Sequence, residues 1–517
     1  MDFIRKLKQF EGLLLALFLF AYTQTGCSKF LDRKPLGQAI NGDVAGGGAQ
    51  AQTFGLYSNL KNSGMTSLPF LVMHANRADD DINSTPGDGS DQQAIVDQFQ
   101  YTKDHWNING LWDDHMAFVT QATGIVHDID SAYSNDASSI VNEAEARFMR
   151  AYAYFDLVRD YGEVPIIKNK VYKASDANVA KSAIADVYAF IDADLQYAVQ
   201  HLPPSWSSEY LGRVTSGSAN ALQAKTYLYR QQWTNALTSA LNVINSGIYS
   251  LDPSYQHLFS EAGENGTESL FEIQNYENAN GSVLITNGLP DYEGVRAPGV
   301  WNLGWGWNLP TQGLVSAFEP NDLRKGTTIL ESDQPDNIFG GVSYGGTLPP
   351  NANVPYWNKK VYSDPARRAS TGDLFGQWLN TIILRYADVL LIAAEADNEA
   401  TGAADSTAIK GWVNIVRERA GLPDVNYISQ AAMRTVIKKE RRVEFGMEFE
   451  RFYDLVRWEN NVGTPGNTNG ATPATDGIDA ITVLGPLGYT KKNAYYPIPQ
   501  EAIDKSNGTL TQNPDYP

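Results

Sequence analysis

Residues 218–247, SANALQAKTYLYRQQWTNALTSALNVINSG, carry the pattern that decides the fold. In two runs, 218–230 and 235–245, apolar residues recur every three or four positions, and a short polar turn separates the runs. This spacing predicts two amphipathic helices that pack against each other. Small side chains lie where the two helices must approach closely: Ala221, Ala224, Ala236 and Ala240.

The same periodicity recurs along the chain and predicts further helices at 143–161, 183–202, 382–399, 408–420 and 431–458. The helix pairs resemble tetratricopeptide repeats, although their spacing is too irregular for periodicity alone to establish this. One such pair cannot bury its apolar faces, so several pairs should stack side by side. The sequence therefore predicts a mostly α-helical fold, a superhelix of tetratricopeptide-like helix pairs.

A long segment, 250–380, interrupts the helical pattern. It is rich in Gly, Pro, Asn, Trp and Tyr, and only 269–274 has the composition of a strand. Long irregular segments within a compact protein usually serve a function. We therefore expect a loop-rich, ligand-binding insert with minor β structure, between an N-terminal helical part (27–249) and a C-terminal helical part (381–517).

Composition excludes one large class of function. The chain has 517 residues, with 59 acidic against 40 basic side chains and a net charge of −19. Such a charge opposes binding to phosphate backbones, so we expect no nucleic-acid partner.

The N-terminus has the pattern of an export signal, with a basic start, an apolar run and then Cys27, the only cysteine. A cysteine after a small residue and an apolar run is typical of the acceptor site of a bacterial lipoprotein. We therefore predict that residues 1–26 are a signal peptide and that Cys27 carries a lipid anchor, such as palmitate, in a membrane. Gln24 departs from this pattern, because an aliphatic or small residue usually stands there.

Several collinear motifs resemble those of the SusD/RagB family. They are EARFMRAYAYFDL (145–157), LRYADVLLIAAEA (384–396), VRERAGL (416–422), RFYDLVRW (451–458) and YPIPQ (496–500). The resemblance implies a cell-surface, lipid-anchored protein of the Bacteroidota outer membrane that binds glycans and is not an enzyme. It also implies a partner, a TonB-dependent SusC-like transporter on which the lipoprotein sits as a lid.

Large aromatic residues in the insert are the first candidate ligand contacts. Trp301, Trp305 and Trp307 fall within seven residues, interleaved with glycines and preceded by Tyr292. Flat rings cover the apolar C–H face of a sugar at low conformational cost. We therefore predict that these four residues bind an oligosaccharide or polysaccharide; the alternative is that the rings pack the insert against the helices.

Analogy with the family adds a second wall for the ligand. It places Asn76, Arg77, Asp79 and Trp106 as polar and stacking partners of the tryptophans. Each could equally be an ordinary structural or solvated residue.

Other site hypotheses are weaker. Asp79, Asp81 and Asn83 imitate half of a calcium loop, but the required glycine is Ser84, so an acidic turn is preferred and we predict no metal or cofactor. The motif GVSYG at 341–345 imitates a nucleophile elbow, yet no histidine follows it. The alternatives to glycan capture are a peptide-binding component of a similar transporter complex and, less favoured, a surface glycosidase.

Overall fold

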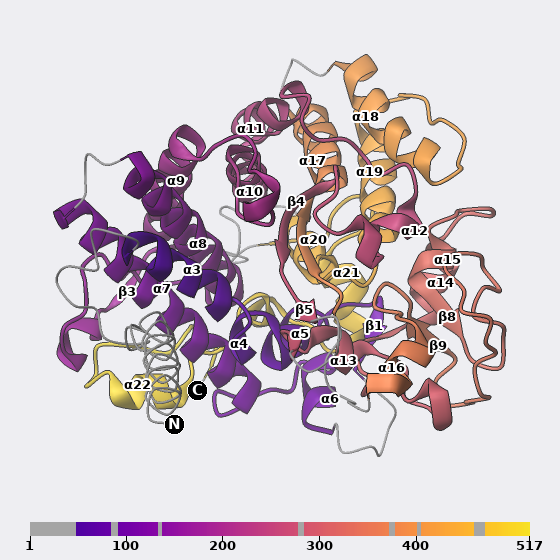
Figure 1. Cartoon of the computed structure of the whole chain (residues 1–517), viewed down its shortest axis with the longest axis horizontal. Helices are drawn as coiled ribbons and strands as arrows, with labels where there is room; N and C mark the ends of the chain where they lie inside the picture. The colour runs from indigo at the N-terminus through magenta and orange to yellow at the C-terminus, as the bar shows by residue number, and fades with distance from the viewer. Residues whose placement is uncertain are drawn as a thin grey trace, which may run out of the picture. The chain divides into compact units, whose positions relative to one another are not determined.

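A row of helices forms the frame of the molecule. In the computed structural model, α7 packs on α8, α8 on α9, α9 on α10, α10 on α11, α11 on α17, and α17 on both α18 and α19 (Figure 1). These helices are α7 (Trp106–Ala132), α8 (Ala137–Tyr161), α9 (Ile184–His201), α10 (Ser216–Tyr229), α11 (Trp233–Asn245), α17 (Tyr386–Glu399), α18 (Ser406–Arg419) and α19 (Gln430–Glu444). The predicted mostly helical fold of stacked pairs with a loop-rich insert is confirmed.

The structure describes residues 48–83, 91–132, 137–277, 284–371, 378–400, 405–459 and 471–516. The predicted signal peptide and Cys27 lie outside these ranges. None of the helices in the described ranges combines the length and the apolar character that crossing a bilayer requires. The shorter helices of the frame are α3 (Gly48–Asn59), α4 (Ser63–Thr66), α5 (Leu68–His74), α6 (Asp91–Asp97), α20 (Arg451–Arg457), α21 (Ala480–Leu484) and α22 (Gln500–Lys505).

Local signals explain where several helices begin and end. α8 ends before Gly162, which takes a φ of 75° that favours glycine. α10 begins after Thr215, whose hydroxyl accepts a hydrogen bond from the Ser218 amide at 3.1 Å. Alanines 221, 224, 236 and 240 are all buried, as close packing of α10 and α11 requires.

Two predicted helices need correction. Residues 382–385 of the predicted helix 382–399 belong to strand β10 (Thr381–Arg385), and only Tyr386–Glu399 is helical. The predicted helix 431–458 is in fact two helices. The first, α19, ends at Glu444, and two residues after it, Met447 and Phe449, adopt positive φ. The Glu444 carbonyl, free at the helix end, accepts from the Tyr255 hydroxyl at 2.5 Å and from Arg385 at 2.8 Å.

The insert is tied to the frame by short antiparallel strand pairs. β4 (Ser269–Ile273) pairs with β10 (Thr381–Arg385), and β1 (Asp81–Ile82) pairs with β7 (Leu309–Pro310). The predicted strand at 269–274 is thus confirmed. The remaining pairs are β2 (Val164–Pro165) with β3 (Lys181–Ser182), β5 (Tyr276–Glu277) with β6 (Leu284–Ile285), and β8 (Ile329–Glu331) with β9 (Tyr356–Asn358).

The insert also has a small apolar core of its own. Trp301, Trp357 and Tyr362 pack there with Leu330 and Leu348, apart from the main core of the frame. The short helices of the insert are α12 (Tyr255–Leu258), α13 (Leu289–Glu293), α14 (Gln312–Ala317), α15 (Lys325–Thr328) and α16 (Pro365–Thr371).

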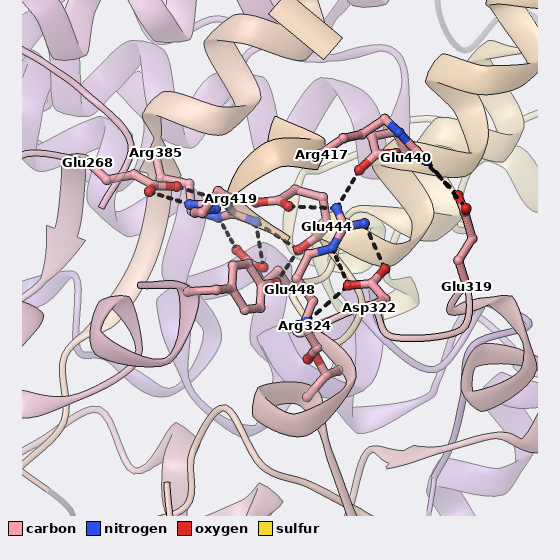
Figure 2. A network of polar contacts seen from close by, with 12 residues as sticks. Glu268, Glu319, Asp322, Arg324, Arg385, Arg417, Arg419, Glu440, Glu444 and Glu448 are labelled. Atoms are coloured by element: carbon pink, nitrogen blue, oxygen red, sulfur yellow. Dashed lines mark hydrogen bonds and ion pairs between the residues drawn. The ribbon is translucent and has the colours of Figure 1, made fainter. Parts of the chain in front are cut away.

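A buried network of arginines and acids fastens the insert to the frame. Glu444 of α19 lies between the guanidinium of Arg324, from the insert, and those of Arg385 and Arg419 (Figure 2). Arg324 is fully buried and donates to both oxygens of Asp322, at 2.9 and 2.8 Å. Breaking one of these ion pairs would leave a buried charge without a partner, which is strongly destabilising. The network therefore holds the insert in a fixed position on α19.

Candidate functional site

Residues 291–307 fold into a hairpin that carries the predicted aromatic residues. Its arms are joined by backbone hydrogen bonds, from Leu303 N–H to the Val295 carbonyl and from Trp307 N–H to the Tyr292 carbonyl, both 2.8 Å. At Gly304 the arms approach so closely that a Cβ atom would lie 2.2 Å from the Asp291 carbonyl oxygen. The glycine spacing seen in the sequence therefore allows the arms to meet.

Three of the predicted aromatic residues form one cluster on this hairpin. The rings of Tyr292 and Trp307 stack, with centroids 5.5 Å apart and planes 12° from parallel. Trp305 packs against Trp307 at 5.8 Å, and the Arg296 guanidinium lies 5.9 Å from the Trp305 ring. Trp307 is buried, whereas Tyr292 and Trp305 are partly exposed and Arg296 is exposed. We call Tyr292, Trp305, Trp307 and Arg296 the aromatic face.

Trp301 is not part of the aromatic face. It is 6% exposed and packs into the core of the insert, where it stacks on Tyr362 at 6.0 Å with planes 8° from parallel. Its ring therefore lies apart from the other three predicted aromatic contacts, and its ligand role stays a prediction. The insert has a core of its own, and Trp301 helps to fill it.

Asn76 and Arg77 are structural residues, each only 1% exposed. The Asn76 amide donates to the Asn83 side chain at 2.8 Å. The Arg77 guanidinium lies 3.8 Å from the ring centroids of both Phe452 and Tyr496 and donates to Asp160. Aromatic rings cover both faces of the Arg77 guanidinium, so the structure gives Arg77 a role inside the frame, and its ligand role stays a prediction.

Asp79 lies close to the hairpin in the fold, but its carboxylate is engaged. It accepts from Arg451 at 2.7 Å and from Arg442 at 2.9 Å. Although burial raises the pKa of Asp79, the charges of these two arginines outweigh it and hold the pKa below its ordinary value. The Thr311 hydroxyl also donates to the Asp79 carbonyl at 2.9 Å, so this residue joins the frame to the chain after the hairpin.

Trp106 is exposed, but it belongs to a different element. It is the first residue of α7, 42% exposed, and its ring lies beside that of His105. Trp106 therefore lies on a helix and not in a loop. No contact given by the structure brings Trp106 to the aromatic face, and its predicted ligand role stays a prediction.

The weaker site hypotheses find structural explanations. Asp81 lies in β1, opposite Pro310, so the half calcium loop includes a paired strand. Within the part of the chain that the structure describes, no three His, Cys, Asp or Glu side chains are placed to hold a metal ion. Ser343 of the GVSYG motif donates to Asp336 at 2.5 Å, which fixes a turn.

The base of the hairpin contains a buried acid, Glu293, which is 2% exposed. Its Oε1 accepts from the side-chain amides of Asn308, at 2.5 Å, and Asn358, at 3.0 Å. Burial raises the pKa of Glu293 to about 8, because these neutral amides and the more distant Lys360 compensate the lost solvation only in part. Glu293 is thus protonated near neutral pH and joins the hairpin to β9.

Sequence reasoning missed Tyr276, the first residue of β5. Its side chain is 55% exposed. The neighbouring Asn275 binds the chain that enters α13, because its Oδ1 accepts from the Asn287 amide at 3.0 Å. A lone tyrosine in a polar segment gives no periodic signal, so the sequence pattern did not single it out.

Comparison with known proteins defines the family. A profile described as the SusD family matches residues 318–516, and one described as starch-binding, associating with the outer membrane, matches residues 54–228. The chain belongs to the SusD family. The family resemblance read from the motifs is therefore confirmed.

Several SusD-like relatives align over most of the chain. SusD-like protein P2 of Formosa agariphila is 28% identical over 477 residues, covering 86% of this chain and 87% of its own. A SusD-like protein of Bacteroides ovatus is 29% identical over 386 residues, covering 70% of this chain and 67% of its own.

Solved structures share the fold. Surface glycan-binding protein A from Bacteroides uniformis superimposes with a TM-score of 0.72 at 22% identity, covering 90% of this chain and 99% of its own. A laminarin-binding SusD-like protein gives 0.70 at 24% identity, covering 91% and 99%. Surface glycan-binding protein A from Bacteroides thetaiotaomicron, in complex with laminarihexaose, gives 0.70 at 23% identity, covering 90% and 99%. At these identities the likeness establishes the fold.

Proposed function

We propose that this protein captures an oligosaccharide on its aromatic face and passes it to a TonB-dependent, SusC-like transporter. The observation that carries the proposal is the pair of partly exposed rings, Tyr292 and Trp305, held on the hairpin by the buried Trp307. The SusD family and its glycan-binding relatives support a saccharide as the cargo.

The chemistry of the aromatic face suits a sugar. Its rings cover apolar C–H groups, and the exposed Arg296 beside Trp305 offers guanidinium N–H donors to hydroxyl groups. Because Trp307 and the paired hairpin arms hold both rings in place, little conformational freedom is lost on binding. The surface stays partly solvated, so we expect modest affinity with fast release, which suits a protein that hands its cargo on.

The location of the protein follows from the same proposal. The description of the family as associating with the outer membrane supports a place at the cell surface. We propose that acylated Cys27 anchors the chain there, with residues 1–26 removed. The protein acts by binding, and the proposal includes no catalytic step.

Isothermal titration of the full chain in detergent with laminarihexaose and maltohexaose tests the glycan assignment. We expect Trp305→Ala to weaken binding about tenfold, the value of one aromatic stacking contact. Tyr172→Ala is the matched control, because Tyr172 is 73% exposed and lies in the segment between α8 and α9. Trp106→Ala tests the remaining predicted contact.

Other outcomes separate the alternatives. Unchanged affinity in Trp305→Ala would remove the aromatic face as the site. If a broad glycan array and both hexasaccharides stay blank while peptides bind, the peptide-binding alternative holds. New reducing ends after incubation with polysaccharides would instead reveal a glycosidase.

A further inference from the structure

A hollow lies inside the insert, beside Tyr362, whose ring stacks on Trp301. It is a cavity of about 250 Å³ between α12, α16 and the turn at 341–346. The residues that line it include Tyr344, Tyr362, Ser363, Asp364, Arg367 and Trp378. No residue of the aromatic face lines this cavity.

The aromatic walls of the cavity are held rigidly. Tyr344 is 46% exposed and meets Tyr362 edge to face, with ring centroids 5.2 Å apart. Tyr362 is backed by the stacked ring of Trp301. Elsewhere in the lining, the Arg367 guanidinium lies 3.4 Å from the centroid of the Trp378 ring. Tyr344 therefore supplies the free aromatic surface, and the other rings support it.

A single carboxylate fixes both tyrosines. Asp336 accepts from the Tyr344 amide at 2.7 Å, from the Tyr362 hydroxyl at 3.1 Å and from the Ser343 hydroxyl at 2.5 Å. The GVSYG segment is thus a turn that presents Tyr344. Such fixed geometry lowers the conformational cost of binding a ligand.

Ser363 is an independent indication of a ligand. Its side chain is 2% exposed and lines the cavity, yet its hydroxyl has no hydrogen-bond partner within the described residues. Buried polar groups are rarely left unpaired, because this costs about 1–3 kcal/mol. A ligand hydroxyl is a partner of the right chemistry.

The charges around the cavity cancel. Lys359 and Arg367 are balanced by Glu261 and Asp364, and Arg367 donates to Glu261 at 2.8 Å. This balance favours an uncharged ligand over a uronate or a sulfated sugar. The volume lies below the range of about 300–1,000 Å³ that is typical of sites for larger ligands, so one sugar ring is the fitting size.

We propose that this cavity is a second saccharide site, which holds one uncharged sugar ring on Tyr344 and hydrogen-bonds it through Ser363. The proposal rests on the proposed function in that the ligand is a glycan, but it uses a separate set of residues. A capture protein with two sites can hold two points of one long glycan and so gain avidity without a stronger single site.

Saturation-transfer NMR of the full chain with glucose, galactose, mannose and xylose tests the second site. We expect transfer from the protein to at least one of these monosaccharides, and about tenfold weaker binding in Tyr344→Ala. Ser363→Ala should weaken the same signal while keeping the fold, since it removes only a hydroxyl. Tyr172→Ala, which touches neither proposed site, should leave that signal unchanged.

The outcomes separate this proposal from the first one. If Trp305→Ala abolishes binding of both monosaccharides and hexasaccharides while Tyr344→Ala and Ser363→Ala change nothing, the second site is refuted and the aromatic face stands. If Tyr344→Ala abolishes all binding and Trp305→Ala none, the cavity binds sugar and the aromatic face is wrong. If the wild type binds none of the four monosaccharides and neither hexasaccharide, both proposals are overturned.

Discussion

Two buried glutamates in neighbouring regions behave in opposite ways. Glu444 lies in the arginine network, where burial raises its pKa but the charges of Arg419, Arg385 and Arg324 outweigh this and hold it well below its ordinary value. Glu293 lies at the base of the hairpin, with two neutral amides as its closest partners, and its pKa rises to about 8. The network consists of many linked ion pairs, whereas the hairpin is held mainly by backbone hydrogen bonds and ring packing, together with the buried pair of Arg368 and Asp291.

This difference divides the roles of the two regions. The network joins segments that are far apart in the chain, so its loss affects the whole fold. The hairpin has the buried ion pair of Arg368 with Asp291, but its partly exposed rings take no part in that pair and can meet a ligand without breaking the fold. Three predictions test the division, beginning with the largest expected effect.

Glu444→Gln should lower the free energy of unfolding by about 3–5 kcal/mol, because three buried guanidinium groups would lose their shared anion. Urea denaturation measures the change. Glu501→Gln is the control, because the Glu501–Lys505 pair is exposed and its loss should cause no measurable change. A wild-type midpoint in Glu444→Gln would show that the network does not fasten the fold.

Trp301→Ala should destabilise the protein by about 3 kcal/mol, because it empties a buried position that supports Tyr362. Trp305→Ala, from the same hairpin, should change the melting temperature little, because its ring is partly exposed. Thermal denaturation of the two variants compares the two sides of the hairpin. Equal stability losses would mean that both rings are core residues.

Glu293→Gln should change how stability depends on pH. Between about pH 4.5 and 8 the folded wild type keeps a proton on Glu293 that the unfolded chain has lost, so its stability falls as pH rises through this window. Relative to the glutamine variant, the fall should be about 1 kcal/mol per pH unit. Denaturant unfolding at pH 6 and pH 7 measures it, and parallel changes in both proteins would show that Glu293 ionises normally.

Much of the frame was predictable because helices depend on short-range periodicity. The spacing of apolar residues, Gly162 and the small alanines of α10 and α11 are local signals, and the structure confirms the helices that they predict. The end of α19 was not predictable, since it depends on Tyr255 and Arg385, which are distant in sequence.

The partners in ion pairs were also not predictable from the sequence. The order of charges along 440–451 favours pairs within one helix, such as Arg441 with Glu444. In the structure Arg441 binds Asp388 and Asp454, and Glu444 binds arginines from other elements. Because buried charges take the partners that enclose them, helical spacing alone does not identify those partners.

Composition, periodicity and motifs were sufficient to predict the family, the helical frame, the place of the insert and its supply of aromatic rings. Which of these rings face outward became clear from the packing of the folded chain. Trp301 and Trp305 are four residues apart and look alike in the sequence, yet one fills the core of the insert and the other lies on the aromatic face. The reason is physical: the exposure of a side chain depends on what packs against it, and in an insert without periodicity that is set by contacts between segments far apart in the chain.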